Sequence, residues 1–335
     1  MDDVAALAGV SVSTVSRALR GSPLVSSETT ARVQAAADEL AFAVSRAASS
    51  LATGRLNRVA VLVSGSLGTW FNGTLLDVLY ACLHERGFEL VIFRTLGRRD
   101  RDEFIATLPA RRNADALIVA SLELTGAQRQ RLHDLGMPLV YVNQTVRGSA
   151  SVAVDDAAGA EVATRHLVNL GHRRLAFART ERHTETNDSS DDRLAGFHRA
   201  VRAAGLPESA QPVVTATQNA DGDGVVASLL ALAQPPTGLV VESDELALSV
   251  LAALGRVGIR VPRDLSVIGF DDHVMAETFG LSTIAQPLDL LGREAATLAL
   301  ALAAGERPRR RNVVAPTRLR LRETTGRPPE PAAAP

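Results

Sequence analysis

The sequence contains no lysine, and all 36 of its basic residues are arginine. Arginine keeps its charge at any site and offers a planar set of hydrogen-bond donors. The single cysteine, Cys82, excludes an intramolecular disulfide framework and any metal site built from several cysteines, and it fits a reducing compartment. With 37 acidic residues the formal net charge is −1, so no overall basic field indicates a nucleic-acid partner. A nucleic-acid partner therefore has to be indicated by a local group of residues.

Long hydrophobic runs are also missing. The longest largely apolar stretch, residues 295–304, has ten residues, whereas a membrane span needs about 20. The chain starts with the acidic sequence Met1-Asp2-Asp3, where a secretory signal needs positive charge. We therefore expect a cytoplasmic protein with no membrane partner.

The composition that is present is ordinary for a globular protein. Hydrophobic residues make up 46% of the chain and charged residues 22%, which excludes a disordered chain. At about 150 residues per domain, a length of 335 residues predicts two or three domains.

Residues 3–42 carry hydrophobic side chains at helical spacing. Three stripes with steps of three or four residues follow one another: Val4, Leu7 and Ala8, then Val15 and Leu19, then Val33, Ala36, Ala37 and Leu40. Each stripe predicts one short helix, and Ser11 and Ser26 are expected to cap the second and third helices. A bundle of about 40 residues lies near the lower size limit for folding alone.

From residue 58 onward, strand-like runs alternate with helices that end at glycines, after a small, polar linker at 43–57. The runs are 59–63, 88–93, 116–120 and 139–142, followed by 174–178, 213–216, 239–241 and 266–270. The alternation predicts two similar halves, each an open parallel sheet covered by helices. A last helix at 288–304 and a strand-like run at 313–321 follow, and each has to be assigned to one of the two halves.

Ligands of open parallel sheets bind outside the carboxyl ends of the strands. These ends offer the following polar, charged and aromatic residues: Ser64, Trp70, Phe71, Ser121 and Asn143 in the first half, then Arg179, Glu242, Ser243, Asp244, Asp271 and Asp272 in the second. Two such edges facing each other predict a polar cleft with aromatic walls, to which Phe270 contributes. For Asp244 and Asp272, capping of the following helices is an equally good interpretation.

The segment from Asp3 to Leu19 has the spacing of a helix-turn-helix. With Val15 and Leu19 turned inward, the exposed face of the second helix consists of Val12, Ser13, Ser16, Arg17 and Arg20. Arg17 has the reach to hold a guanine edge, while Ser11, Thr14 and Ser16 suit phosphates. Residues 1–58 hold six arginines against five acidic residues, a net charge of +1, so a three-helix protein-interaction module remains an alternative.

Patterns for catalysis, metals and cofactors are weak. Residues 222–227 fit the dinucleotide-binding pattern G-x-G-x-x-A, but the preceding strand ends around residue 216, so a plain loop into a helix is the better interpretation. The seven histidines do not cluster with metal-ligand spacing, and Cys82 lies within a hydrophobic helix pattern. We expect no enzyme, no metal site and no cofactor.

Motifs along nearly the whole chain resemble, in their order, those of the lactose and galactose repressor family. They are Asp3–Leu19, Val25-Ser26 and Ser45–Leu51, then Val154–Ala160, Leu170–Arg174, Arg193–Phe197, Ser243-Asp244, Val261–Asp272 and Gln286-Pro287. Each motif is moderately specific, but the ordered series makes an accidental match improbable.

This resemblance implies a homodimer whose heads bind a pseudo-palindromic operator in double-stranded DNA. It also implies a periplasmic-binding-protein-like core that holds a small effector, often a sugar or a nucleobase. The linker would fold into a hinge helix on DNA, with Leu51 in the minor groove and Arg46 and Ala48 beside it. The implied effector contacts are Asp155 or Asp156, Arg193, Ser243, Asp271 and Gln286, with Trp70 and Phe71 on the opposite wall. Ser243 stands where the family often has Asn, which shortens a polar arm.

We therefore expect an α/β protein with a small helix-turn-helix head at residues 1–42, a hinge at 43–57 and a core of two doubly wound parallel-sheet subdomains. The first subdomain is expected to comprise about 58–155 and 287–312, the second 156–286 and 313–326, and a disordered tail 327–335. The expected function is a ligand-responsive repressor of sugar-utilisation genes. The alternatives are a nucleoside- or purine-responsive regulator of the same family, or a small-molecule binding protein that does not bind DNA.

Overall fold

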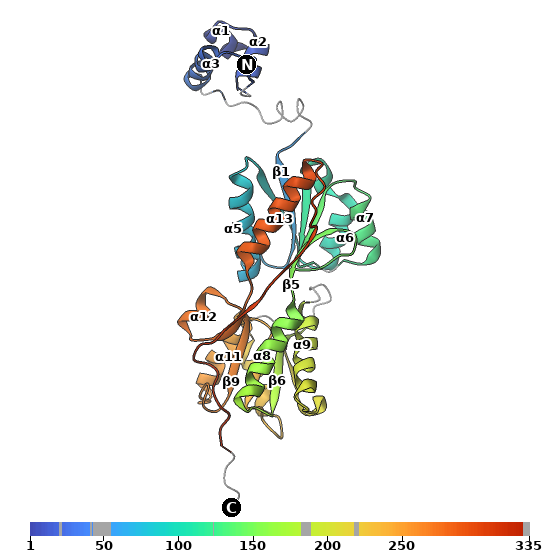
Figure 1. Ribbon diagram of the computed structural model, residues 1–335, viewed down its shortest axis with the longest axis vertical. Helices are drawn as coiled ribbons and strands as arrows, with labels where there is room; N and C mark the ends of the chain where they lie inside the picture. The colour runs from blue at the N-terminus through green and yellow to red at the C-terminus, as the bar shows by residue number, and fades with distance from the viewer. Residues whose placement is uncertain are drawn as a thin grey trace, which may run out of the picture. The chain divides into compact units, whose positions relative to one another are not determined.

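The computed structural model describes residues 1–19, 22–40, 42, 55–122, 124–181, 189–217 and 221–330. The chain divides into two units, a head of residues Met1–Asn57 and a core of residues Arg58–Pro335 (Figure 1). Of the predicted hinge, residues 43–54 lie outside the described residues, as do residues 331–335 of the predicted tail.

The head is a bundle of three helices, α1 (Asp2–Ala8), α2 (Val12–Leu19) and α3 (Ser27–Glu39). Both predicted N-caps are confirmed, because Ser11 Oγ accepts from the Thr14 amide at 3.2 Å and Ser26 Oγ from the Thr29 amide at 3.2 Å. Each cap satisfies an amide that has no partner within its helix.

Among the described residues, the hydrophobic interior of the head is built from small side chains. Its buried side chains are all alanine or valine: Val4, Ala5, Ala8, Val15, Ala18, Val33, Ala36 and Ala37. The predicted core positions Leu7 and Leu40 are wrong, since they are 48% and 43% exposed. A helix as short as α1 turns only one side to its neighbours, and Ala5, not Leu7, lies on that side.

In the described part of the core, the first sheet has six parallel strands in the order β11-β5-β4-β3-β1-β2. Their bounds are β1 (Arg58–Ser64), β2 (Glu89–Thr95), β3 (Ala116–Ala120), β4 (Leu139–Val142), β5 (Ala150–Val154) and β11 (Asn312–Ala315). Helices α5 (Trp70–His84) and α13 (Leu288–Ala303) cover one face (Figure 1). Helices α6 (Arg98–Thr107) and α7 (Gly126–His133) cover the other, and the short helix η1 (Pro109–Arg112) precedes β3.

The second sheet has the order β12-β10-β9-β8-β6-β7, and only β12 runs antiparallel to its neighbour among these described strands. The strands are β6 (Leu175–Thr180), β7 (Val213–Ala216), β8 (Gly238–Val241), β9 (Ser266–Asp271), β10 (Ser282–Ala285) and β12 (Arg318–Arg320). Helices α8 (Asp156–Leu170) and α9 (Ser189–Ala203) pack on one face, and α10 (Gly222–Leu230) and α11 (Asp244–Arg256) on the other. Two short helices complete this half. In the chain, η2 (Glu208–Ala210) lies between α9 and β7, and α12 (Val274–Thr278) lies between β9 and β10. The predicted α/β class with two doubly wound sheets is confirmed.

The chain crosses between the sheets three times, after β5, after β10 and after β11. The boundary expected at residue 312 is wrong, because β11 pairs with β5 in the first sheet and places residues 313–315 in the first half. A four-residue edge strand beside a second short strand gives no local signal of which sheet it joins. Both β5 and β10 are also absent from the sequence-based prediction.

The end of the chain is more structured than expected. The Gly326 carbonyl accepts from His172 Nε2 at 2.9 Å, and the Gly326 amide donates to Ser266 Oγ at 3.0 Å. Pro328 follows close to Gly171, where an added Cβ would lie 3.6 Å from the proline ring. Residues 327–330 therefore continue the core.

Two helices approach each other very closely at Gly196 in α9. A Cβ at this position would lie 2.1 Å from the carbonyl oxygen of Ala157 in α8, a distance that no real Cβ contact reaches. Only glycine lets the two backbones come this close. The contact lies one helical turn from Arg193 and next to Asp156, so it fixes how these two side chains meet.

Candidate functional site

A cluster of buried polar side chains lies at the carboxyl ends of the strands of the second half. Asp156 is the first residue of α8, Arg193 lies in the first half of α9, Asp271 ends β9 and Gln286 follows β10. All four side chains are buried. This is the edge at which the sequence predicted a ligand site.

Several residues at these strand ends have positive φ. The angles are 48° for Ser121, 60° for Asn143, 129° for Asp271 and 63° for Asp272. Residues other than glycine adopt such angles at a cost, and this kind of strain gathers at ligand sites. The backbone at this edge is held in a shape that a simple strand-to-helix connection does not require.

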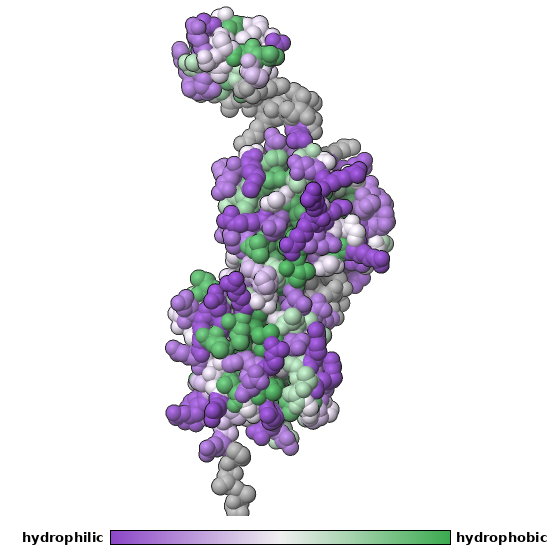
Figure 2. Space-filling model, in the orientation of Figure 1, coloured by the Kyte–Doolittle hydropathy of each residue, from purple (hydrophilic) through white to green (hydrophobic). Residues whose placement is uncertain are grey.

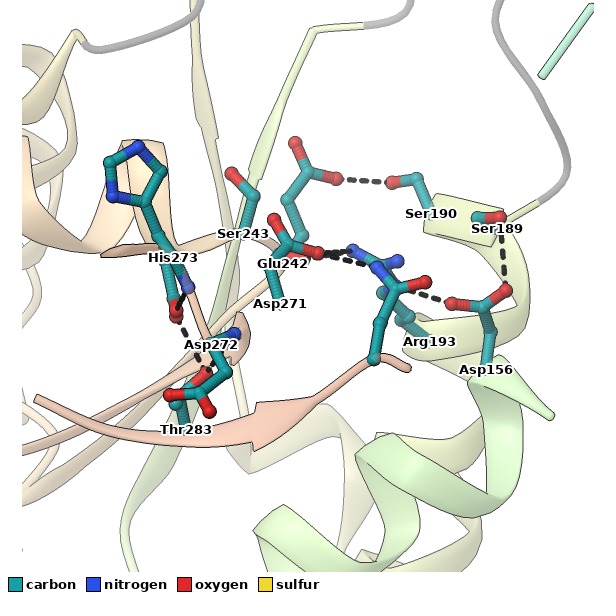
Figure 3. Close-up of polar contacts among 12 residues, drawn as sticks. Asp156, Ser189, Ser190, Arg193, Glu242, Ser243, Asp271, Asp272, His273 and Thr283 are labelled. Carbon is teal, nitrogen blue, oxygen red and sulfur yellow. Dashed lines mark hydrogen bonds and ion pairs between the residues drawn. The ribbon is translucent and has the colours of Figure 1, made fainter. Parts of the chain in front are cut away.

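Arg193 is the centre of the cluster (Figure 3). Its Nε donates to Asp156 Oδ1 at 2.7 Å, and its Nη1 donates to the Glu242 carbonyl and lies 3.6 Å from Asp271 Oδ1. The guanidinium carbon lies 3.8 Å from the ring centroid of Phe270, in cation–π contact. Gln286 Nε2 donates to Asp271 Oδ1 at 2.6 Å. A single cation thus holds two carboxyl groups and one carbonyl in a buried environment.

The charges of the cluster shift one another's pKa. Burial acts to lower the pKa of Arg193, but Asp156 and Asp271 outweigh it, so the pKa is raised. Burial raises the pKa of Asp271 to about 7, against the lowering effects of Arg193 and of the Gln286 hydrogen bond. The neighbouring Asp244 is fully buried, and burial together with the charge of Asp271 raises its pKa well above the usual value. The pKa of Asp271 therefore lies near neutral pH, and that of Asp244 is raised in the same direction.

We predict that ionisation of Asp271 destabilises the folded core. Because its folded pKa lies above the unfolded value, its contribution to stability is full below about pH 4 and is lost as the pH rises through about 7. The raised pKa of Asp244 acts in the same direction. Asp271→Asn should therefore lose less stability than the wild type between pH 5 and pH 8 in urea unfolding. Parallel pH profiles for the two proteins would contradict this.

A second layer of hydrogen bonds surrounds the cluster and reaches the first half. Ser189 Oγ donates to Asp156 Oδ2 at 3.0 Å, and Ser190 Oγ donates to Glu242. Asn143, which follows β4, donates from Nδ2 to Ser189 Oγ at 3.3 Å. The contacts of Arg193 are therefore connected through one hydroxyl to the edge of the first sheet.

Trp70 makes a further connection between the halves. Its amide, at the start of α5, donates to Glu245 Oε1 at 2.9 Å, and its ring centroid lies 5.7 Å from that of His273. Glu245 belongs to α11 and His273 caps α12, so both partners belong to the second half. Phe71 packs on the hydrophobic core of the first half.

Three buried polar atoms at these strand ends lack a hydrogen-bond partner among the described residues. They are Asn143 Oδ1, Arg179 Nη2 and Gln286 Oε1, and all three residues are buried. An unsatisfied buried polar group costs roughly 1–3 kcal/mol. Two acceptors and one donor without partners, at the strand ends of the two halves, fit a small polar ligand.

The structure distinguishes among the predicted effector residues. Asp156, Arg193, Asp271 and Gln286 are brought together, whereas Asp155 is exposed and caps α8 through the Ala158 amide at 2.8 Å. Ser243 Oγ caps α11 by accepting from the Leu246 amide at 3.3 Å. The effector role of each residue remains a prediction.

The capping interpretation of Asp244 and Asp272 is wrong. The caps of the following helices are Ser243 and His273. Asp244 instead accepts from the His273 amide at 2.8 Å and from Thr283 Oγ1 at 2.7 Å. Asp272 accepts from Arg322 Nη2 at 2.7 Å. These bonds reach segments far along the chain, so no local pattern could reveal them.

Sequence reasoning did not assign roles to Ser189, Ser190 and Glu245. Ser189 and Ser190 stand at the end of a long polar stretch in which no hydroxyl is distinguished by spacing. Glu245 is one of two acidic residues in the first turn of α11, where carboxylates are expected for the helix dipole alone.

The predicted DNA-binding face lies on the outside of α2. Ser11, Val12, Ser13 and Arg17 are exposed, and Thr14 and Ser16 are partly exposed. Arg20 lies outside the described residues, as do Arg46, Ala48 and Leu51 of the predicted hinge. The burial of Val15 and Ala18 on the opposite side agrees with the predicted rotation of the helix.

Other functional patterns gain no support in the described residues. Residues 222–227 begin α10, which is capped by Asp221, as the plain interpretation predicted. Cys82 is buried in α5. Among the described side chains, no group of three or more metal-ligand residues is found. The helices searched include none of the length and apolarity needed to cross a bilayer.

Head and core together define a class: a DNA-binding helix-turn-helix joined to a two-lobed ligand-binding core. Residues 1–45 match the bacterial regulatory proteins of the lacI family, and residues 164–325 match the periplasmic binding protein-like domain. The chain is 33% identical to the HTH-type transcriptional regulator CelR of Thermobifida fusca over 338 residues, which covers 97% of each chain.

Solved structures agree with this match. A complex of the transcriptional regulator CelR with cellobiose aligns with a TM-score of 0.71 and 30% identity, covering 96% of this chain and 98% of the other. The lac repressor dimer bound to operator and the anti-inducer ONPF aligns with a TM-score of 0.85 and 26% identity, covering 97% and 98%. The chain belongs to the lacI family of DNA-binding transcriptional regulators. The resemblance seen in the sequence is confirmed.

Proposed function

We propose that the protein represses sugar-utilisation genes, binds a pseudo-palindromic operator as a dimer and responds to an uncharged sugar. The observation that carries the proposal is the Arg193 cluster, which joins the second half to the first through Ser189 and Asn143. A ligand that replaces these contacts changes the hydrogen bonds that connect the two halves. The complex of CelR with cellobiose supports a sugar as the ligand class.

The charge of the cluster supports an uncharged effector. Arg193 faces two carboxyl groups and Arg179 Nη1 lies 3.0 Å from Asp191 Oδ1, so both cations already have acidic partners, which disfavours a phosphate. Two further carboxylates, Glu242 and Glu245, bond to groups around the site. Sugar hydroxyls can donate to these oxygens, and Trp70 offers an apolar face for a pyranose ring.

The effector would act through a coupling free energy between its own binding and operator binding. Such coupling is typically about 1–3 kcal/mol, a change of 5- to 150-fold in affinity. The effector changes the relation of the two halves, and the first half connects to the head through β1. That relation decides whether the two heads of a dimer can bind both half-sites at once.

The test combines calorimetry and gel shifts. Purified protein is titrated with neutral mono- and disaccharides, the matching sugar phosphates and nucleosides, and each ligand that binds is added to a gel shift on the DNA upstream of the protein's own gene. We expect a neutral sugar to bind and to change operator affinity. Binding of a sugar phosphate alone would contradict the charge argument, and binding of a nucleoside alone would favour the alternative ligand class.

The second half carries exposed hydrophobic residues that fit a dimer interface. Val274, Met275 and Phe279, in and just after α12, are 73%, 39% and 56% exposed. Figure 2 shows hydrophobic surface in the part of the second half where α12 lies. Contiguous apolar patches on a soluble protein mark contact surfaces.

We predict that Phe279→Asp weakens the dimer at least tenfold. The substitution places a charge in an apolar contact, where it loses its hydration. Sedimentation velocity at micromolar concentration should show a shift from dimer to monomer. The control is Leu230→Asp, which changes a residue of similar exposure (53%) in α10. Equal behaviour of the two variants would exclude the α12 surface as the interface.

We predict that Arg17→Ala reduces the preference for operator over random DNA by roughly 1–3 kcal/mol, while binding to random DNA persists. The reason is that a base-reading arginine discriminates among sequences, whereas phosphate contacts do not. Competition gel shifts at a fixed salt concentration measure this preference. Equal losses on both DNAs would assign Arg17 to the phosphate backbone instead.

A further inference from the structure

A dense group of arginines lies between α13 and β11. The connection carries Arg307, Arg309, Arg310 and Arg311, which are all exposed, together with one acidic residue, Glu306. Four positive charges against one negative charge give these six residues a net charge of +3. Residues 306–311 are called the arginine loop below.

The arginine loop lies at the amino-terminal edge of the first sheet. The Arg311 carbonyl accepts from the Ser151 amide at 2.8 Å, which ties the loop to the start of β5. Arg311 also lines a hollow of about 350 Å³ together with Pro138 and Gly148, which stand just before β4 and β5. The loop is therefore held against the sheet, with its side chains at the surface.

The same edge receives the chain from the head. The strands of this sheet are parallel, so β1 and β11 begin at the same edge, and Arg58 is the first residue of β1 (Figure 1). Residues 43–57 join the head to this point. At about 3.4 Å per residue, fifteen residues span at most about 50 Å when fully extended. The linker therefore ends at the edge of the sheet that also carries the arginine loop, with β5, β4 and β3 between β11 and β1 in the strand order.

The head alone is poorly charged for a DNA-binding domain. Residues 1–58 have a net charge of only +1, whereas specific DNA-binding proteins commonly neutralise about six to ten phosphates. The arginine loop supplies three times that charge in six residues. Guanidinium groups hold phosphates by two parallel hydrogen bonds, so arginine suits this contact better than lysine does.

We propose that the arginine loop is a second DNA-binding surface, which contacts phosphates of the duplex beside the segment bound by the head. The inference rests on the proposed function in that the head has to bring the duplex to the core. Contacts of this kind add affinity and salt dependence but no sequence preference. The core is then part of the DNA-binding apparatus as well as the effector sensor.

The test measures the salt dependence of binding with the full-length protein and a 60-base-pair duplex of random sequence. Fluorescence anisotropy gives the dissociation constant between 50 and 300 mM NaCl. For R309Q/R310Q/R311Q, we expect the slope of log K against log salt to become shallower by roughly 2–3 per protomer. Affinity at 100 mM salt should fall at least tenfold. The charge-preserving variant R309K/R310K/R311K should keep most of the wild-type slope.

The matched control is R165Q/R263Q/R327Q, which removes three exposed arginines from the second half and should leave the slope within 0.5 of the wild type. The proposal is overturned if the loop variant keeps the wild-type slope, or if the control loses as much. It also fails if the lysine variant behaves like the glutamine variant, because the loss is then structural. Melting followed by circular dichroism checks that each variant folds.

The outcomes separate this proposal from the proposed function. A shallower slope for the loop variant, in a protein that prefers no operator, supports the arginine loop and overturns the operator proposal. If the operator preference is intact and the slope of the loop variant is unchanged, the operator proposal is supported and the arginine-loop proposal is overturned. If the wild type binds no duplex at 50 mM salt, both fail.

Discussion

Arg193→Leu should lower the free energy of unfolding of the core by about 3–5 kcal/mol, since removal of one partner leaves buried charge uncompensated. In the folded protein Asp156 and Asp271 face this guanidinium at 2.7 and 3.6 Å, and all three side chains are buried. Leucine fills much of the space but donates no hydrogen bond. The midpoint of thermal unfolding should fall by roughly 10 °C.

The control for this prediction lies in the same helix. Arg199 is 51% exposed and lies 3.4 Å from Glu161, so Arg199→Leu should cost less than about 1 kcal/mol. Adding Asp156→Asn and Asp271→Asn to Arg193→Leu should restore part of the loss, because the buried charges are removed with their partner. Urea unfolding at pH 7 measures all three proteins. A small effect of Arg193→Leu, comparable to that of Arg199→Leu, would mean that the carboxyl groups find water or are already protonated.

Gly196→Ala should destabilise the core by about 3 kcal/mol, at the upper end of the usual cost of overpacking. The new methyl group would meet the Ala157 carbonyl oxygen at 2.1 Å and the Glu161 amide nitrogen at 3.0 Å, and both atoms belong to the backbone of α8. The helices have to separate, which also lengthens the bond between Arg193 and Asp156. Effector affinity should therefore fall along with stability.

Gly255→Ala is the matched control, because this glycine of α11 has nothing within 4 Å of its Cβ position. Alanine there should stabilise the protein by roughly 0.5–1 kcal/mol through its helix propensity. Chemical denaturation of the two variants compares the same substitution in a crowded and in an open site. If both variants were equally stable, the α8–α9 contact would not limit the packing.

Much of the fold was predictable because its signals are local. Buried parallel strands such as β1 and β3 are continuous hydrophobic runs, and the serines that cap α2 and α3 stand next to the hydrophobic stripes. The strands that were missed, β5 and β10, are short and contain small or hydroxyl residues. Their burial comes from neighbours on both sides, which the sequence does not display.

The site was predictable in outline but not in its contacts. The position of Asp271 at a strand end pointed to the site, whereas Asp156 and Arg193 were implied only by the family resemblance. The partners of Asp244 and Asp272 are Thr283 and Arg322, which lie 39 and 50 positions further along the chain. Only the fold brings such pairs together, so the sequence left open the choice between capping and a longer-range role.

The three connections between the halves differ in stiffness. The second contains Pro287, with φ of −83°, and the third contains Pro316, whereas the first, between Val154 and Asp156, has no proline. A proline ring restricts φ to a narrow range, so rotation at these two connections falls mainly on ψ and on their neighbours. The first connection leads directly into Asp156. A rotation at this connection would therefore reorient the carboxylate that Arg193 holds, and with it the charge distribution of the cluster.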